Sequence, residues 1–256
     1  FNYIIDDKTF KDDFYQSVTP KEFYDNIRNG ATPSTSQVAP AETEAAFRNA
    51  IESGVPTVYL CFSSGLSSNY STAYAIWSQL KAEHPEAPIY IVDLLIGSTP
   101  EGLLVLEALR QRESGLTAEE MVAWAEEARY FVQTLFMVDD LDALHRGGRI
   151  PASVAFAGSK LDLKPLLNFD TNGKLSLAGA SHGRKKGLKQ LASFYGKAHA
   201  ENSNFALIGH ADSEKDADRV CELLAKQDES ITVIKHNIGA TIGSHVGAGM
   251  VSISFW

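Results

Sequence analysis

Two short apolar segments, with an amphipathic segment between them, constrain the fold of this chain most strongly. Residues 57–62 (TVYLCF) and 89–93 (IYIVD) are nearly continuous apolar runs, as expected of strands buried on both faces of a parallel sheet. Between them, Tyr70, Tyr74 and Trp77 recur at helical spacing. Strand, helix and strand in this order form a βαβ unit, so the N-terminal part is predicted to be an α/β domain.

Helix boundary signals surround this unit. Pro40 can stand in the first turn of a helix that Gly54 ends. Thr117 and Glu120 have the spacing of a capping box, which predicts that a second helix begins there.

The second half of the chain has a different pattern. Residues 131–138 (FVQTLFMV) indicate a strand, and Asn172-Gly173 between two strand-like pieces indicates a β-hairpin. Residues 251–255 (VSISF) alternate apolar residues with serine, which predicts a strand with two distinct faces. We therefore predict an N-terminal parallel-sheet α/β domain over residues 1–128 and a C-terminal α+β domain over residues 129–256.

Composition excludes several classes of protein. The chain has 32 acidic and 23 basic residues and a net charge of −9, whereas nucleic-acid binding usually needs a basic face. No Cys/His cluster has zinc spacing, so no metal site is predicted. The two cysteines, Cys61 and Cys221, give no disulfide framework, which favours a reducing, cytoplasmic compartment. No apolar run reaches the roughly 18 residues that a membrane helix needs.

The stretch SSGLSS, residues 63–68, follows a predicted buried strand and precedes a helix. Ligands of open α/β sheets bind beyond the carboxyl ends of strands, and a helix N-terminus favours an anion. Ser63 and Ser64 supply hydroxyls, and Gly65 permits close backbone approach. The alternative is that Ser67 or Ser68 caps the helix and the rest is a turn.

Three further loops are candidates. Thr35 and Ser36 lie in a hydroxyl-rich loop before a helix, and their side chains could donate to an oxygen-bearing group or merely cap the helix. Gly243 and His245 lie in a glycine-rich segment that could contact a ligand or form a turn before the last strand.

The third loop, LHRGGRI, holds Arg146 and Arg149 on either side of a Gly-Gly pair. The two guanidinium groups could bind an anion or an acidic partner, or they could cap carbonyl groups at a helix end. SSGLS does not have the G-x-S-x-G pattern of a nucleophile elbow, and no phosphate-binding loop is present.

Taken together, these segments resemble the DegV family of bacterial fatty-acid-binding proteins. The motifs that carry the resemblance occur in order along the chain: TSQ (35–37), SSGLS (63–67), DLLIGSTPEGLLV (93–105), LHRGGRI (144–150), KPLL (164–167), GHAD (209–212) and IGSHVGAG (242–249).

The resemblance implies two domains with a lipid tunnel between them, a long-chain fatty acid as ligand, and no cofactor. It implies a lipid-binding component rather than an enzyme: a separate ATP-dependent kinase subunit phosphorylates the bound fatty acid, and the acyl phosphate enters phospholipid synthesis. Transient contact with a membrane surface is compatible with this role. The family also begins with a strand ending in TDS, absent here, so we expect the natural chain to start before Phe1.

The resemblance assigns roles residue by residue. Thr35 and Ser64 match the hydroxyls that bind the carboxylate, and His245 matches a histidine beside the same head group. Ser36, Ser63, Gly65 and Gly243 lie in the same motifs. Arg149, with Arg146, belongs either to the surroundings of the head group or to the kinase contact, and the sequence leaves these two roles open.

Two other functions remain as alternatives. Ser64 as nucleophile and His245 as base would give an acyl hydrolase or acyltransferase, although no third member of a triad is identifiable. Arg146 and Arg149 could instead make the protein a sensor of small anions.

Overall fold

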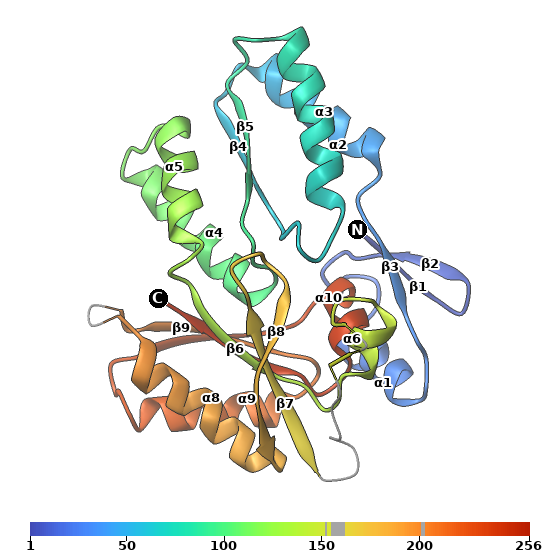
Figure 1. The fold of residues 1–256 in the computed structure, drawn as a ribbon, viewed down its shortest axis with the longest axis vertical. Coiled ribbons are helices and arrows are strands. Elements are labelled where there is room, and N and C mark those ends of the chain that lie inside the picture. The colour runs from blue at the N-terminus through green and yellow to red at the C-terminus, as the bar shows by residue number, and fades with distance from the viewer. Residues whose placement is uncertain (152, 155–161, 201–202) are drawn as a thin grey trace. The chain divides into compact units, whose positions relative to one another are not determined.

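The computed structural model describes residues 1–151, 153–154, 162–200 and 203–256, which form two compact units (Figure 1). The first unit contains residues 1–36, 133–170 and 175–256, and the second contains residues 37–132 and 171–174. The sequence-based division between residues 128 and 129 lies close to the junction at 132–133. It differs for residues 1–36, which the structure groups with the C-terminal half because strands in this segment contact helix α10 (Ala240–Val246).

The second unit contains the predicted βαβ element. Strands β4 and β5 pair in parallel with Thr57 opposite Ile89, and α3 connects them. Phe47, Leu80 and Ile89 are buried in its core. The elements of this unit are α2 (Pro40–Ser53), β4 (Thr57–Cys61), α3 (Asn69–Glu83), β5 (Ile89–Asp93), α4 (Thr99–Glu113) and α5 (Ala118–Ala128).

The predicted helix boundaries in this unit are confirmed. Pro40 is the first residue of α2, and Gly54 ends it in the left-handed conformation with φ of 65°. Thr117 caps α5, because its hydroxyl accepts a hydrogen bond from the backbone N–H of Glu120 and the Glu120 side chain returns to the Thr117 backbone.

The first unit is built on a mixed six-stranded sheet, of which β6, β7, β8 and β9 are labelled in Figure 1. The strand order is β10-β9-β11-β6-β7-β8. Strand β11 runs antiparallel to both of its neighbours, and β7 and β8 form the hairpin that Asn172-Gly173 predicts. The strands are β6 (Gln133–Met137), β7 (Leu163–Phe169), β8 (Leu175–His182), β9 (Phe205–His210), β10 (Thr232–Asn237) and β11 (Val251–Phe255).

Helices α8 (Arg184–Ala198) and α9 (Glu214–Ala225) cover one face of this sheet. Leu191 and Tyr195 of α8 and Val220 of α9 pack with Ile253 and Phe255 of β11, and all five side chains are buried. The burial follows from the helical spacing of apolar residues on α8 and α9.

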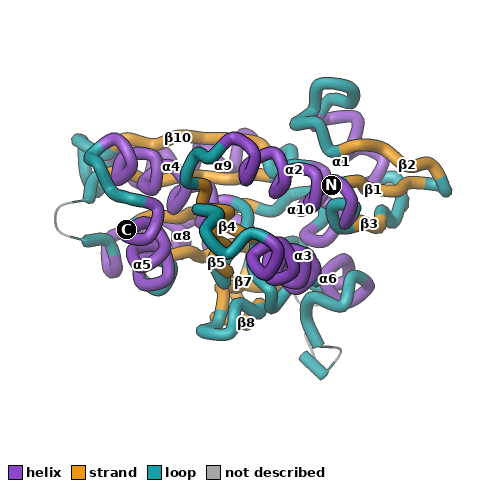
Figure 2. Tube along the Cα trace, turned by 90° about the horizontal axis from the view of Figure 1, so that it is seen from above, coloured by secondary structure: helices purple, strands orange, loops and turns teal. Residues whose placement is uncertain are grey.

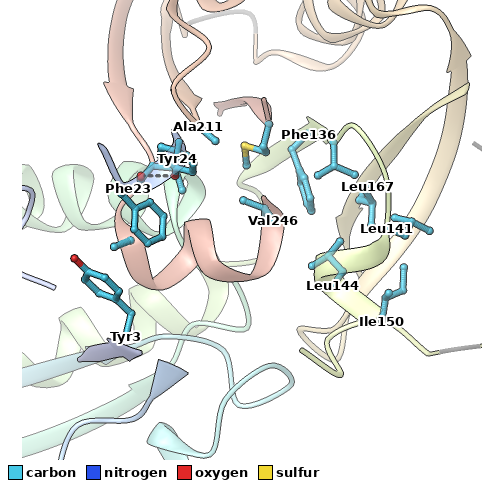
Figure 3. Close-up of a cluster of buried hydrophobic side chains, with 14 residues drawn as sticks. Tyr3, Phe23, Tyr24, Phe136, Leu141, Leu144, Ile150, Leu167, Ala211 and Val246 are labelled. Atoms are coloured by element: carbon cyan, nitrogen blue, oxygen red, sulfur yellow. Dashed lines mark hydrogen bonds between the residues drawn. The ribbon is translucent and has the colours of Figure 1, made fainter. Parts of the chain in front are cut away.

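The opposite face packs against α1 (Pro20–Arg28), α6 (Asp142–Arg146) and α10 (Ala240–Val246). Figure 3 shows the cluster, in which Val246 of α10 lies among side chains from the sheet and from α6. Tyr24 is fully buried, and its hydroxyl donates a hydrogen bond of 2.7 Å to the carbonyl oxygen of Ile238. This bond ties α1 to the segment that leads into α10.

A small antiparallel sheet completes the unit, with the order β2-β1-β3 (Figure 2). Its strands are β1 (Asn2–Ile5), β2 (Lys8–Lys11) and β3 (Ser34–Ser36). Asp6 and Asp7, at φ of 48° and 63°, form the tight turn between β1 and β2. Tyr3 of β1 meets the Phe23 ring of α1 edge-on at 5.2 Å, so the sheet is anchored to the core through aromatic packing.

Within the described ranges, none of the helices is long and apolar enough to cross a membrane. Cys61 is buried and Cys221 is partly buried, and both thiols are free.

Candidate binding site

The first unit brings together two of the predicted ligand residues. Thr35 lies in β3, where pairing with β1 places it opposite Tyr3, and His245 lies in the last turn of α10. Thr35 Oγ1 and His245 Nε2 share a hydrogen bond of 2.8 Å, although 210 residues separate them in the chain. Elements from the two ends of the chain therefore build one polar pair.

His245 is neutral at pH 7. Burial lowers the pKa of its imidazole to about 4, and the positive charge of Arg149 acts in the same direction. Its Nδ1 atom is buried and has no hydrogen-bond partner among the described residues. An unpaired buried nitrogen is costly, so this atom marks a position where a ligand could supply the missing partner.

Arg149 belongs to the surroundings of this pair. Its side chain donates a hydrogen bond to the carbonyl oxygen of Gly147, directly after α6, and its burial lowers the pKa of the guanidinium. Arg146, at the end of α6, is exposed. The two arginines therefore have different environments.

Gly243 and Ser36, the other predicted ligand residues of the first unit, each have a structural place in it. A Cβ atom at Gly243 would lie 2.5 Å from the Tyr24 hydroxyl oxygen and 2.9 Å from Cε1 of Phe23. The glycine thus lets α10 approach α1 closely. Ser36 is exposed and pairs with Asn2 in the small sheet.

The SSGLSS loop lies in the second unit, between β4 and α3. Ser63 is fully buried, donates its hydroxyl to the carbonyl oxygen of Gly173 over 2.8 Å, and accepts from the Gly65 N–H over 3.1 Å. A Cβ atom at Gly65 would lie 2.6 Å from the carbonyl oxygen of Asn172. Ser63 and Gly65 therefore hold the β7–β8 turn.

The backbone donors of this loop are largely satisfied internally. The N–H groups of Leu66 and Ser67 donate to the Ser63 carbonyl oxygen, and that of Ser64 donates to Asp93 Oδ1 over 3.1 Å. The predicted anion site made of free N–H groups is therefore not formed at these positions, because the loop makes its own turn before α3 begins at Asn69.

Among the hydroxyls of this loop, Ser64 differs from the others. Ser67 Oγ accepts from the Asn69 N–H over 3.1 Å, and the Ser68 hydroxyl donates to Gln37 Oε1 over 2.9 Å. Ser68 stands at the N-cap position but makes no side-chain cap bond, so the capping hydroxyl is that of Ser67. Ser64 is exposed, and its hydroxyl has no hydrogen-bond partner in the part of the chain that the structure describes.

Sequence reasoning missed two residues that shape these loops. Asp93 accepts a hydrogen bond from the Ser64 backbone N–H. Its position at the carboxyl end of β5, where loops of a parallel sheet meet, could have indicated this contact. Gly147 lies against the His245 ring. The Gly-Gly pair in HRGGR indicated a turn at this loop, but nothing in the sequence indicated that the turn contacts His245.

The Thr35–His245 pair has the distance of a nucleophile and its base, but not the rest of a triad. No described residue orients Nδ1, and a pKa of about 4 makes the imidazole a weak base at pH 7. Within the described ranges, no group of three or more His, Cys, Asp or Glu side chains is placed to hold a metal ion. The pair thus offers two neutral hydrogen-bonding groups.

The fold and this site define a two-unit α/β protein with a hydrogen-bonded pair of Thr35 and His245. The family model described as "Uncharacterised protein, DegV family" matches residues 1–256, so the chain belongs to the DegV family. It is 35% identical over 252 residues to a DegV domain-containing protein of Clostridium perfringens, covering 98% of this chain and 87% of that protein.

Solved structures agree with this assignment. A fatty acid binding DegV family protein from Streptococcus agalactiae is 27% identical with a TM-score of 0.85, and the match covers 99% of this chain and 88% of that one. The Fak B3 protein of Streptococcus pneumoniae fatty acid kinase, loaded with linoleic acid, has a TM-score of 0.86 at 17% identity, over 99% of this chain and 88% of that one. At that identity the second likeness shows the fold alone.

Proposed function

We propose that this protein binds a long-chain fatty acid and that His245, whose ring Thr35 orients, donates a hydrogen bond to its carboxylate. The observation that carries the proposal is the neutral His245, hydrogen-bonded to Thr35 at Nε2 and left with a buried, unpartnered Nδ1. If Thr35 donates to Nε2, then Nδ1 carries the proton and can donate it to a carboxylate oxygen. The binding of fatty acid by the Streptococcus agalactiae relative supports the same ligand class.

The energetics are consistent with tight, non-covalent binding. A carboxylate taken out of water needs donors, and a hydrogen bond to a charged group contributes about 1.5–3 kcal/mol. An acyl chain adds about 0.8 kcal/mol for each buried methylene, so a sixteen-carbon chain supplies roughly 10 kcal/mol before the costs of association.

Ser64 is proposed as a further ligand residue, in the second unit. Its side chain is exposed and its hydroxyl has no partner among the described residues, whereas the hydroxyls of Ser63, Ser67 and Ser68 have partners within the protein. The proposal for Ser64 is independent of that for Thr35 and His245, and the tunnel that the family resemblance implies stays a prediction.

We further infer that the protein delivers its fatty acid to a separate ATP-dependent kinase subunit. The support is the family resemblance of the sequence motifs, together with the exposure of Arg146 in an acidic chain. Arg149 is assigned to the surroundings of the head group instead, because its guanidinium is partly buried and its charge acts on His245.

Lipid extracted from the denatured protein and identified by mass spectrometry tests the ligand class. Finding no fatty acid, together with no binding of added palmitate or oleate, would contradict the proposal.

For the site, we compare Thr35→Val, Thr35→Ser and Ser36→Ala by titration with palmitate. Thr35→Val should weaken binding about tenfold or more, because each 1.4 kcal/mol is tenfold, whereas Thr35→Ser keeps the hydroxyl and Ser36→Ala is the exposed neighbouring control. Equal affinities for all three would remove Thr35 from the site.

The acyl hydrolase alternative is tested with p-nitrophenyl esters. Ester turnover that disappears in Ser64→Ala would favour it, and the absence of turnover in the unaltered protein would remove it.

A further inference from the structure

The two adjacent glycines after α6 are needed for different reasons. Gly148 has φ of +70°, where glycine is strongly favoured, and a Cβ atom there would meet nothing within 4 Å. Gly147 has φ of −72° and ψ of −12°, a helical conformation open to any residue. Backbone conformation thus explains the glycine at 148 but not the glycine at 147.

The space beside Gly147 is taken by His245. A Cβ atom at position 147 would lie 2.4 Å from Nδ1 and 3.2 Å from Cε1 of the imidazole. Non-bonded atoms of this kind pack at about 3.5–4.0 Å, so a methyl group would displace the ring by about 1 Å.

The His245 ring cannot move without losing a hydrogen bond or disturbing the turn after α6, because it is held between Thr35 and that turn. On one side, Nε2 shares its 2.8 Å hydrogen bond with Thr35. On the other side, the turn is held by backbone hydrogen bonds from Gly147 to Ala143 and from Arg149 to Leu144, and by the Arg149 side chain on the Gly147 carbonyl oxygen.

We propose that Gly147 is a positioning residue of the binding site: its missing side chain lets the imidazole of His245 lie between the end of α6 and Thr35, which fixes the ring for the ligand. The ligand part rests on the proposed function, whereas the placement of the ring does not. The Arg149 side chain contributes by holding the carbonyl group of the same glycine.

The test compares Gly147→Ala with Gly196→Ala. Both changes add a methyl group with a contact of 2.4 Å, but at Gly196 that contact is Oε1 of Gln227 and does not involve His245. We expect Gly147→Ala to bind palmitate about tenfold more weakly or worse, and Gly196→Ala to bind as the unaltered protein does.

A second readout follows the ring itself. By NMR, the pKa of the His245 imidazole should be higher in Gly147→Ala than in the unaltered protein, because a ring pushed out of its place is less buried. Unchanged titration together with unchanged affinity would overturn the proposal, and so would weaker binding with an unchanged titration. If the unaltered protein binds no fatty acid, the proposed function fails, while the titration still tests the position of the ring.

The double variant Gly147→Ala/His245→Ala covers the case in which the single change prevents folding. Removing the ring removes the contact. The drop in melting temperature that Gly147→Ala causes in the unaltered protein should therefore be absent when the same change is made in His245→Ala. An equal loss in both backgrounds would show that the methyl group clashes with something other than His245 and would overturn the proposal.

Discussion

The hydroxyl of Ser63 donates a hydrogen bond of 2.8 Å to the carbonyl oxygen of Gly173, 110 residues further along the chain. The bond joins the loop after β4 to the turn of the β7–β8 hairpin. Glycine is required on both sides, because a Cβ atom at Gly173 would lie 2.1 Å from Ser63 Oγ and one at Gly65 would meet the backbone of residues 172 and 173. Two neighbouring serines thus have opposite surroundings, with Ser63 buried and Ser64 exposed.

This contrast predicts that the two serines separate stability from binding. Ser63→Ala leaves a buried carbonyl group without its donor, so the free energy of unfolding should fall by about 1–3 kcal/mol, with fatty-acid affinity nearly unchanged. Ser64→Ala should keep the stability within about 0.5 kcal/mol and weaken fatty-acid binding. Chemical denaturation and palmitate titration of both variants check the two halves, and equal effects on affinity would contradict the distinction.

The close approach of the two loops predicts a specific sensitivity at Gly65. Gly65→Ala places a methyl group 2.6 Å from a backbone oxygen that cannot rotate away, so overpacking should cost about 1–3 kcal/mol of unfolding free energy. Gly196→Ala is the matched control, because its methyl group meets the end of a side chain and no backbone atom. Denaturation midpoints that agree for both variants would show that the β7–β8 turn can retreat.

How far the sequence predicts this structure depends on how many residues separate the two partners of each interaction along the chain. The βαβ unit, the caps at Gly54 and Thr117 and the Asn172-Gly173 hairpin were predicted correctly, since each depends on residues close together in the chain. Strand β11 was predicted with two distinct faces, but both are buried. It lies between β9 and β6, where the Ser254 hydroxyl pairs with Thr134, and alternating serine and apolar residues do not reveal a central strand.

The candidate site depends on long-range contacts, which local patterns do not contain. The spacing of Thr35 and His245 gave no sign that they meet; the family resemblance alone placed both at one head group, and their 2.8 Å hydrogen bond is the structural observation. The contact of Gly147 with His245 and that of Gly65 with Asn172 were not predicted. A glycine needed for space has no local signature, unlike a glycine needed for its backbone conformation.

The lowered pKa of His245 predicts a loss of stability in acid. The unfolded chain binds a proton on this histidine below about pH 6.5, whereas the folded protein resists protonation until about pH 4. The free energy of unfolding should therefore fall as the pH drops from about 6.5 to 4, by up to about 3 kcal/mol from this group, since one pKa unit corresponds to about 1.4 kcal/mol. Denaturation of the unaltered protein and of His245→Asn at several pH values checks this, and a slope that persists in His245→Asn would assign it to other groups.

Glu101, near the start of α4, should act with the opposite sign. Burial raises the pKa of its carboxyl group to about 7, although it accepts a hydrogen bond from the Ser98 backbone N–H. The folded protein then holds a proton that the unfolded chain releases above about pH 4.5. The contribution of this proton to the free energy of unfolding is therefore full below pH 4.5 and is lost as the pH rises through 7. Glu101→Gln keeps the acceptor oxygen and removes the titration. It should therefore raise the free energy of unfolding at pH 8, by up to about 3 kcal/mol, and change it little at pH 4.

Glu120 provides the matched control for this prediction. It occupies the same capping-box position in α5 and accepts from the Thr117 N–H over 2.8 Å, but it is exposed, and its hydrogen bonds lower the pKa of its carboxyl group. Its contribution is present above pH 4.5 and is lost as the pH falls, so Glu120→Gln should lower stability at pH 8, where Glu101→Gln raises it. If both glutamine variants changed the stability at pH 8 in the same direction, the burial of Glu101 would not be what sets its pKa.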